Sequence, residues 1–495
     1  MIRRLVRHSF RIAIIDNQSN TPGGLGVGVD FGTSNSTIAW FDGQALHLVP
    51  LEGESPILPS AIHLNREFAA LTGSTAVTHY VEENRGRLVQ LVAEEIGEEG
   101  MALGELGRAG GRGDASGLRR VVYGPLVDRG QTGRLFQELK RLLGNRSTER
   151  LMVFQRAYRL VALITPILER MRRALELSTG QPVGRIHLGR PVNFEGRGAR
   201  RNELAASRLA EAAENAGFRQ LTFFEEPVAA TLSYLWRAGP QAQGTALTVD
   251  FGGGTLDLSV IRYSGMQFQV LSTAGTSLGG NKIDQMIYTK LLFPALGAGE
   301  TWTRQVDGRV LEGVFPFQEY ETGLLSWPTT YLLNQNATKS KVVERIAQGG
   351  PAAVKFERLK DLISYNYSYN CFQAIRKAKA ALSQVEATVL DIPEINLEIP
   401  FTRAMLDEIL QPALETLRQL IDEVIVAAGI ERNDISLVIR TGGSSEIVAV
   451  RRLLDELFPG KVTVHDPFTS VAGGLAIASY QGIHGPRPAA SESAR

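Results

Sequence analysis

This 495-residue chain has a single cysteine and a net charge of only +1. Cys371 stands alone, so no intrachain disulfide can form and a reducing compartment fits best. The 53 Lys and Arg residues nearly balance the 52 Asp and Glu residues, which argues against broad binding to nucleic acids or membrane surfaces. No stretch approaches the ~18 apolar residues of a membrane span. We therefore expect a cytoplasmic protein with no nucleic-acid partner and no membrane partner.

Familiar nucleotide and metal motifs are also missing. The sequence has no GxxxxGKS/T phosphate loop and no HExxH zinc motif, and the glycines before Val29 do not form GxGxxG. Its seven histidines are scattered along the sequence, so their spacing gives no support for a zinc enzyme. Glycine, in contrast, is abundant: 51 residues make about a tenth of the chain, against a usual share of roughly 7%. This excess directs attention to loops that bind ligands through the backbone.

One internal repeat decides the interpretation of the sequence. The segment VGVDFGTS at 27–34 is echoed by LTVDFGGGT at 247–255. Both predict a strand that ends in Val-Asp-Phe-Gly, then a glycine turn with hydroxyl groups, then a second strand. Asp30 and Asp250 are 220 positions apart, which is too far for a solenoid repeat and suits a duplicated domain with one copy in each lobe.

The repeated unit has the chemistry of a phosphate site. An aspartate at the end of a buried strand is costly unless it meets a cation or hydrogen-bond donors. The glycines after it let backbone N–H groups approach a ligand closely and form a nest for an anion. Two such units facing each other would grip a polyphosphate from both sides, with Asp30 and Asp250 holding a hydrated Mg²⁺.

Alternating strands and helices predict an α/β architecture with central sheets. The apolar patterns predict helices over residues 203–216, 404–428 and 448–457 and strands over 185–188, 246–250, 256–262 and 436–441. Three segments are expected to be irregular: a glycine-rich mobile loop at 100–117, an elaborated insertion at 296–350 and a tail from residue 485.

Five segments, in the correct order, resemble the nucleotide-binding domain of the DnaK-type (seventy-kilodalton class) heat-shock chaperones, within the wider actin and sugar-kinase fold. They are VGVDFGTSNS (27–36), EEPVAATLSYL (225–235), VDFGGGTLDLSV (249–260), AGTSLGGNKID (274–284) and VIRTGGSSEIVAVRRLLDELF (438–458). The sequence around residues 189–192 and the insertion at 296–350 look more like those of the shorter YegD-like relatives. The chain stops soon after Tyr480, so we expect the peptide-binding domain of the full chaperones to be absent.

The resemblance implies an actin-like ATPase fold, a duplicated ribonuclease-H-like domain with two lobes around a nucleotide cleft. The implied boundaries are a disordered extension over 1–23, lobe I over 24–240 with an inserted subdomain at about 61–174, lobe II over 241–461 with an inserted subdomain at about 286–397, a return to lobe I over 462–482 and a disordered tail over 483–495.

The resemblance also implies roles for individual residues. Asp30 and Asp250 would position Mg²⁺ and its waters. Lys140, in QELKRLLG, would reach the γ-phosphate, although it could instead be a surface lysine on an amphipathic helix. Glu226 would hold the metal waters or the attacking water, although it could simply complement a helix N-terminus.

The remaining candidates would bind the nucleotide. Those for the phosphates are Gly32, Thr33, Ser34, Asn35, Gly252, Gly253, Gly254 and Thr255, and those for the nucleoside side are Gly280, Lys379, Ser383, Gly442, Gly443 and Ser444. Lys379 and Ser383 could equally belong to a solvated helix face. Asp257 follows Thr255 by two positions and is expected to support the second loop.

Three positions depart from the family pattern. Arg376 stands where the family usually has an acidic ribose contact, Glu446 where it has an arginine, and Phe468 where it has an acidic residue. The residues expected to bind the phosphates thus follow the family pattern, whereas those expected to bind the adenosine depart from it. We expect ATP binding with changed, weaker affinity for adenosine.

The function implied by the resemblance is that of a chaperone-family ATPase which hydrolyses ATP slowly and couples its nucleotide state to lobe closure and to a protein partner. Two alternatives stay open at this point. One is a small-molecule kinase of the sugar type, for which we see no acceptor motif. The other is a catalytically weak nucleotide sensor, scaffold or filament.

Overall fold

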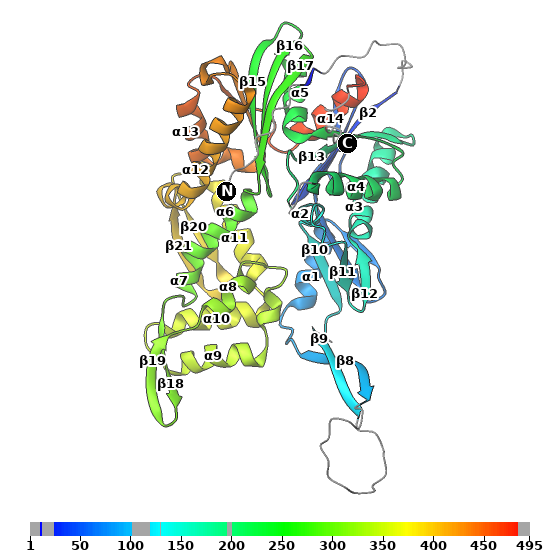
Figure 1. Cartoon of the computed structure of the whole chain (residues 1–495). Helices are drawn as coiled ribbons and strands as arrows, with labels where there is room; N and C mark the ends of the chain where they lie inside the picture. Colours follow the sequence, from blue (N-terminus) through cyan, green and yellow to red (C-terminus); the bar gives the residue numbers. More distant parts are fainter. Residues whose placement is uncertain (1–9, 12–23, 101–118, 129, 196–199, 484–495) are drawn as a thin grey trace, which may run out of the picture.

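Two separate sheets organise the chain, and each forms the core of one lobe (Figure 1). The computed structural model describes residues 10–11, 24–100, 119–128, 130–195 and 200–483. Among these residues, no helix is both long enough and apolar enough to cross a membrane.

The lobe I sheet contains the first copy of the repeated unit. Its strand order is β14 (Gln220–Glu225), β13 (Arg185–Arg190), β2 (Gly26–Phe31), β3 (Asn35–Phe41) and β4 (Leu46–Leu48), with β5 (Leu58–Pro59) paired to β3. Strands β2 and β3 form an antiparallel hairpin in which Asp30 lies opposite Thr37, and β13 runs parallel to β2. Helices α3 (Leu160–Thr179) and α4 (Arg201–Asn215) bury their apolar faces against this sheet.

The lobe II sheet follows the same plan. Its strand order is β1 (Phe10–Arg11), β17 (Gln267–Thr276), β16 (Leu256–Ser264), β15 (Gln243–Phe251), β22 (Leu437–Thr441) and β23 (Val462–Val464). Here the hairpin is β15–β16, Asp250 lies opposite Asp257, and β22 runs parallel to β15. Helices α12 (Arg403–Ala428) and α13 (Val448–Leu457) pack on one face. The duplicated α/β architecture and the strands and helices predicted from the apolar patterns are confirmed.

Helices α5 (Glu226–Ala238) and α14 (Ser470–Tyr480) lie between the two sheets (Figure 1). Their buried side chains form one cluster that includes Ala246 and Ile439 of the lobe II sheet and Phe224 of the lobe I sheet. Helix α14 also packs along β2, β3 and β13 of lobe I. The small residues of α14, such as Gly473 and Ala476, allow this close packing on both sides.

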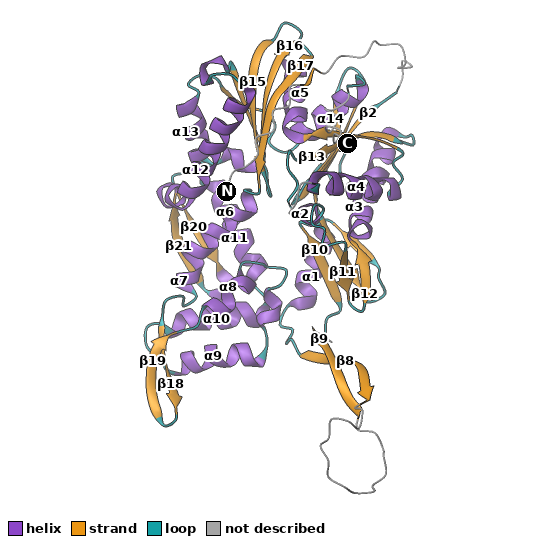
Figure 2. Cartoon of the chain, in the orientation of Figure 1, coloured by secondary structure: helices purple, strands orange, loops and turns teal. Residues whose placement is uncertain are grey.

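Each lobe carries an inserted segment at the same end of the molecule (Figure 2). In lobe I the insertion contains β6 (Ala61–Asn65), β7 (Ala70–Thr72), α1 (Ser74–Asn84), β8 (Leu91–Gly100), β9 (Arg119–Asp128), β10 (Gly133–Gln137), α2 (Leu139–Leu142), β11 (Arg150–Val153) and β12 (Arg156–Arg159). Strands β10, β6 and β7 form a small sheet with α1 packed against it.

In lobe II the insertion is mainly helical. It contains α6 (Gly280–Ile287), η1 (Tyr288–Leu292), α7 (Phe293–Ala295), β18 (Thr301–Val306), β19 (Arg309–Val314), α8 (Gln318–Leu324), η2 (Thr330–Leu333), α9 (Asn336–Ala347), α10 (Ala353–Tyr365), α11 (Ser368–Ala381), β20 (Ala387–Ile392), η3 (Pro393–Ile395) and β21 (Leu397–Thr402). Two short helices, η4 (Arg432–Asp434) and η5 (Gly443–Glu446), belong to the lobe II body.

Two expectations need correction. Residues 296–350 are not irregular, because their scattered aromatics form a core: Phe315 packs edge-on against Trp302 at 5.3 Å between ring centroids, beside buried Tyr320. Within the expected disordered extension, Phe10 and Arg11 pair with Val270 and Gln269 at the edge of the lobe II sheet. The mobile loop expected at 100–117, apart from residue 100 at the end of β8, and the tail from residue 485 lie outside the described residues.

Candidate functional site

A cavity of about 870 Å³ lies between the lobes and gathers the predicted residues. Both repeated units open into it, since Asp30 lies at the end of β2 and Asp250 at the end of β15. Of the sequence-predicted candidates, the lining includes Asp30, Gly32, Thr33, Ser34, Asn35, Lys140, Glu226, Asp250, Gly252, Gly253, Gly254, Thr255, Gly280, Lys379, Gly442, Gly443 and Ser444.

Ser383 is the exception among these candidates. Helix α11 ends at Ala381, and Ser383 lies in the turn that follows it. It is not among the described residues that line the cavity. The nucleotide-binding role of Ser383 therefore stays a prediction.

The two glycine loops touch each other across the lobes. A Cβ atom on Gly254 would lie 2.6 Å from the side chain of Thr33, and one on Gly253 would lie 2.6 Å from Ser34 Oγ. Glycine is thus required at these positions for the loops to meet. Asn281, on α6, donates from Nδ2 to Ser34 Oγ at 3.1 Å and links the same two lobes.

A buried ion pair lies beside the loops. Lys140, from the short helix α2, contacts Glu226, the first residue of α5, through its Nζ and the glutamate Oε1. Only 5% of Lys140 and 7% of Glu226 is exposed. Burial opposes the charged form of Lys140, but the carboxylates of Glu226 and Asp30 outweigh it and raise the pKa of the lysine. Lys140 is therefore a buried cation and not a surface lysine.

The aspartates of the repeat are held in an unusual electrostatic state. Burial, reinforced by Glu226, raises the pKa of Asp30 to about 7 despite the nearby Lys140. Burial and Glu226 also raise the pKa of Asp250 well above its usual range. Within the described part of the chain, Asp30 Oδ1 is buried with no hydrogen-bond partner. A divalent cation bound to both carboxylates would offset this cost, so the residues fit Mg²⁺.

Asp257 supports the second loop from below, as expected. Its Oδ1 accepts a hydrogen bond from the backbone N–H of Val192 at 3.1 Å, and it also interacts with the Thr255 side chain. Burial and the neighbouring Glu226 raise the pKa of Asp257 to about 7. Asp257 thus joins the start of β16 to lobe I through Val192.

The far side of the cavity has charged groups that are already paired. Asp284, buried on α6, contacts the Lys379 ammonium and accepts a hydrogen bond from Arg376 Nε at 3.1 Å. Next to the cavity, but not among its described lining residues, Glu446 accepts a hydrogen bond from Arg440 at 2.6 Å. Asp284 was not singled out from the sequence, although the NKID segment that contains it was part of the resemblance. Its partners come from α11, nearly a hundred positions away, so no local pattern announces the pair.

Phe468 occupies the third departing position. Its side chain is 51% exposed and lines the cavity next to Gly443, where an added Cβ would lie 3.0 Å from the ring. The aromatic ring is thus placed beside the Gly442–Ser444 turn, where a planar ligand group could stack on it.

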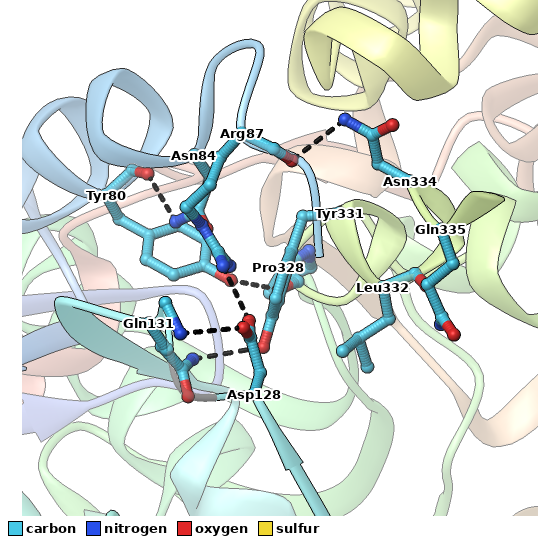
Figure 3. Close-up of polar contacts among 11 residues, drawn as sticks. Tyr80, Asn84, Arg87, Asp128, Gln131, Pro328, Tyr331, Leu332, Asn334 and Gln335 are labelled. Carbon is cyan, nitrogen blue, oxygen red and sulfur yellow. Dashed lines mark hydrogen bonds and ion pairs between the residues drawn. The ribbon is translucent and has the colours of Figure 1, made fainter. Parts of the chain in front are cut away.

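The two insertions contact each other through the polar side chains drawn in Figure 3, beside residues that line the cavity. Tyr80 of α1 donates its hydroxyl to the carbonyl of Pro328, and Gln131 Nε2 donates to the Tyr331 hydroxyl at 3.0 Å. Val77 and Thr78 of the same helix, and Pro328 opposite, line the cavity. None of these cross-lobe partners was identified from the sequence.

Arg87 and Asn334 complete this contact. Asn334 Nδ2 donates to the backbone carbonyl of Arg87 at 2.8 Å, and the backbone carbonyl of Asn334 accepts the N–H of Val89 at 2.8 Å. The Arg87 guanidinium pairs with Asp128 at 2.6 Å and lies 4.9 Å from the centroid of the Tyr331 ring. The two lobes are thus linked at both ends of the cavity, by the loops and by the insertions.

A family model described as Hsp70 protein matches residues 144–294 and 361–488, more than half of the chain. The chain belongs to the Hsp70 family. Its two-lobed α/β structure is the actin-like ATPase fold of that family. The stretch between the two matched segments falls within the lobe II insertion. The closer likeness to YegD-like relatives stays a prediction.

Curated relatives carry the names of Hsp70-family chaperones. The chain is 27% identical over 322 residues to a chaperone protein DnaK of Cenarchaeum symbiosum, covering 63% of this chain and 39% of that protein. It is 24% identical over 464 residues to the DnaK of Thermoplasma acidophilum, covering 91% and 57%. A chaperone protein HscA homolog of Acidithiobacillus ferrooxidans is 26% identical over 310 residues, covering 62% and 38%. The chain thus spans about half the length, or less, of these relatives.

Proposed function

We propose that this Hsp70-family protein binds ATP with Mg²⁺ between its lobes, hydrolyses it slowly to ADP and phosphate, and couples the nucleotide state to lobe closure and to binding of a protein partner. The observation that carries the proposal is the buried Lys140–Glu226 pair, placed beside Asp30 and Asp250 where the two glycine loops meet. Phosphoryl transfer needs this combination of positioning and charge neutralisation more than covalent chemistry.

The loops bind the phosphates in this proposal. Backbone N–H groups of the turns after Asp30 and Asp250 approach the phosphate oxygens, and hydroxyls at the same level, such as those of Thr33 and Thr255, add donors. Asp30 and Asp250 hold the magnesium ion through its waters. The bound ion supplies positive charge that balances the phosphates and keeps both aspartates ionised.

Lys140 and Glu226 act on the reacting group. The Lys140 ammonium stabilises the charge that develops on the transferring phosphoryl oxygens, and it acts strongly because it is buried. The Glu226 carboxylate accepts a hydrogen bond from the attacking water and orients it. Glu226 also holds Lys140 in place before the substrate arrives.

Lobe closure follows from the origin of these groups. The residues that bind the nucleotide come from both lobes, so a bound nucleotide stabilises the arrangement in which the loops touch. Loss of the nucleotide frees the lobes to move about α5 and α14. We propose the lobe boundaries given by the resemblance, near residues 240 and 461. The two insertions, around residues 61–135 and 286–350, offer surfaces for a partner that would sense closure.

Single-turnover hydrolysis of γ-labelled ATP tests the proposal. The wild-type protein with Mg²⁺ should release phosphate without any acceptor, and Lys140→Ala should slow the release by ~10² or more. Lys377→Ala, which changes an exposed lysine on α11, is the matched control and should leave the rate unchanged. Equal rates in Lys140→Ala and wild type would overturn the assignment. ADP formed only when a sugar acceptor is added would favour a kinase instead.

A further inference from the structure

Two of the scattered histidines meet a glutamate in the lobe I insertion. His63 lies on β6, and His79 and Glu83 lie one turn apart on α1. His63 Nε2 is 2.8 Å from Glu83 Oε2, and His79 Nε2 is 3.2 Å from Glu83 Oε1. Both imidazoles therefore turn the same nitrogen toward one carboxylate, and the three side chains offer ligand atoms within 4.8 Å of one another. The fold has thus assembled a ligand set that the spacing of the histidines along the sequence concealed.

The cluster is enclosed on one side and open on the other. The His63 side chain is fully buried and Glu83 is largely buried, whereas 45% of His79 is exposed. Gly133 of β10 forms the closed wall, because a Cβ there would lie 1.9 Å from His63 Nε2 and 2.6 Å from Glu83 Oε2. The backbone of β10 therefore approaches the ligand atoms directly, and solvent reaches them from the His79 side.

We propose that His63, His79 and Glu83 form a binding site for a divalent transition-metal ion, with Zn²⁺ as the best match. Two imidazoles and one carboxylate are a ligand set that zinc accepts, and they leave a fourth position for water or another donor. Zn–N and Zn–O bonds of ~2.0–2.1 Å place tetrahedral ligand atoms roughly 3.3 Å apart, close to the 2.8 Å and 3.2 Å that separate Glu83 oxygens from the two imidazoles, and the histidines would converge on the ion from the two sides of the carboxylate.

Each imidazole Nε2 faces one oxygen of the Glu83 carboxylate. In the metal-free arrangement the two imidazoles can donate their Nε2 protons to Glu83, and a metal ion would take the place of those protons. A metal-bound histidine usually donates its other ring N–H to a neighbouring group, which strengthens metal binding. Within the described residues, His63 Nδ1 has no such partner. We therefore expect micromolar affinity and not the tight binding of a structural zinc site.

A metal ion here would act on the contact between the two insertions. It would tie α1 to β6, and α1 is the helix that lines the cavity with Val77 and Thr78 and reaches Pro328 of the other lobe through Tyr80. Fixing this helix would stabilise the cross-lobe contact of Figure 3 and slow the release of nucleotide. This second step rests on the proposed function, whereas metal binding itself does not.

The site is tested on the full chain, stripped of metal with a chelator and free of nucleotide. Titration with Co²⁺ should produce the strong visible bands of a tetrahedral complex with nitrogen and oxygen ligands, and Zn²⁺ should displace it. His79→Gln should weaken Zn²⁺ binding, measured by calorimetry, by about tenfold or more. His79 is half-exposed, so its loss should leave folding intact, as circular dichroism can check. His47→Gln, at another part-exposed histidine of lobe I, is the matched control.

The outcomes separate the two claims. Equal Zn²⁺ affinity in His79→Gln and wild type, or no binding at millimolar Zn²⁺, would overturn the site. Dissociation of a fluorescent ADP should be slower with Zn²⁺ in the wild type and insensitive to Zn²⁺ in His79→Gln. Zn²⁺ binding that leaves this release unchanged would overturn the coupling alone. Absence of nucleotide binding would count against the proposed function and leave the cobalt result standing.

Discussion

At the end of the cavity that we propose binds phosphate, matching loops from the two lobes press against each other, and a buried carboxylate oxygen beside them lacks a partner. Asp30 Oδ1 is buried with no hydrogen-bond partner in the described structure, and burial raises the pKa values of Asp30 and Asp250. Such groups gain a great deal from a ligand that brings charge of the opposite sign.

At the base end the side chains are already satisfied by one another. Asp284 pairs with both Lys379 and Arg376. A ligand that used these charges would first have to break existing ion pairs, so its net gain would be small. The comparison indicates that most of the nucleotide affinity should come from the phosphates and the metal ion. Phe468 should make the main contact with the base.

The largest effect should come from a change at the phosphate end. Asp250→Asn keeps the shape of the side chain but removes the charge that holds Mg²⁺, so ATP affinity in the presence of Mg²⁺ should fall by roughly 10². Calorimetry with Mg²⁺ and again with EDTA measures this, and the variant should resemble the wild type in EDTA. Asp455→Asn, at an exposed position of α13, is the control. A Mg²⁺ effect that survives in Asp250→Asn would remove the proposed metal site.

A smaller effect is expected at the base end. Phe468→Ala removes the stacking surface, and because the ring is half-exposed we expect about a fivefold loss of ATP affinity, at the low end for base stacking. Inorganic tripolyphosphate, which has no base, should bind both proteins equally. Val464→Ala, on an exposed side chain of β23, should change neither affinity. An equal loss for tripolyphosphate and ATP would break the comparison between the two ends.

The smallest effect should come from the contact between the two insertions. Tyr331→Phe deletes the hydroxyl that accepts the Gln131 hydrogen bond but keeps the ring beside Arg87. Loss of one neutral hydrogen bond should speed the release of fluorescent ADP by roughly threefold. Tyr365→Phe, at an exposed tyrosine of α10, serves as the comparison. Release that stays at the wild-type rate would mean that the phosphate end alone holds the lobes together.

The phosphate end was predictable from sequence because its chemistry lies in two short, contiguous motifs. Asp30 and Asp250 each sit within a few residues of the glycines and hydroxyls that act with them, and the repeat itself signals two facing copies. Lys140 is an intermediate case. The resemblance placed it in the cleft, and the structure buries it there, but nothing in QELKRLLG distinguishes it from a surface lysine.

The rest depends on contacts between distant segments. Tyr80 and Pro328 are 248 positions apart, and His63 meets Glu83 only because β6 and α1 pack together. The aromatics of residues 296–350 gave no clear period because they face one another from a hairpin and separate helices. The end of α11 at Ala381, just before Ser383, was not marked by glycine or proline.

The position of α14 between the sheets has a consequence for biosynthesis. Strand β2 ends at Phe31, yet the helix that covers it begins at Ser470, more than 400 residues later. A ribosome-bound chain therefore carries an apolar surface of lobe I that waits for almost the whole of lobe II to be made. Lobe I can be completed only after α14 has emerged, so the two lobes of this protein must finish folding together.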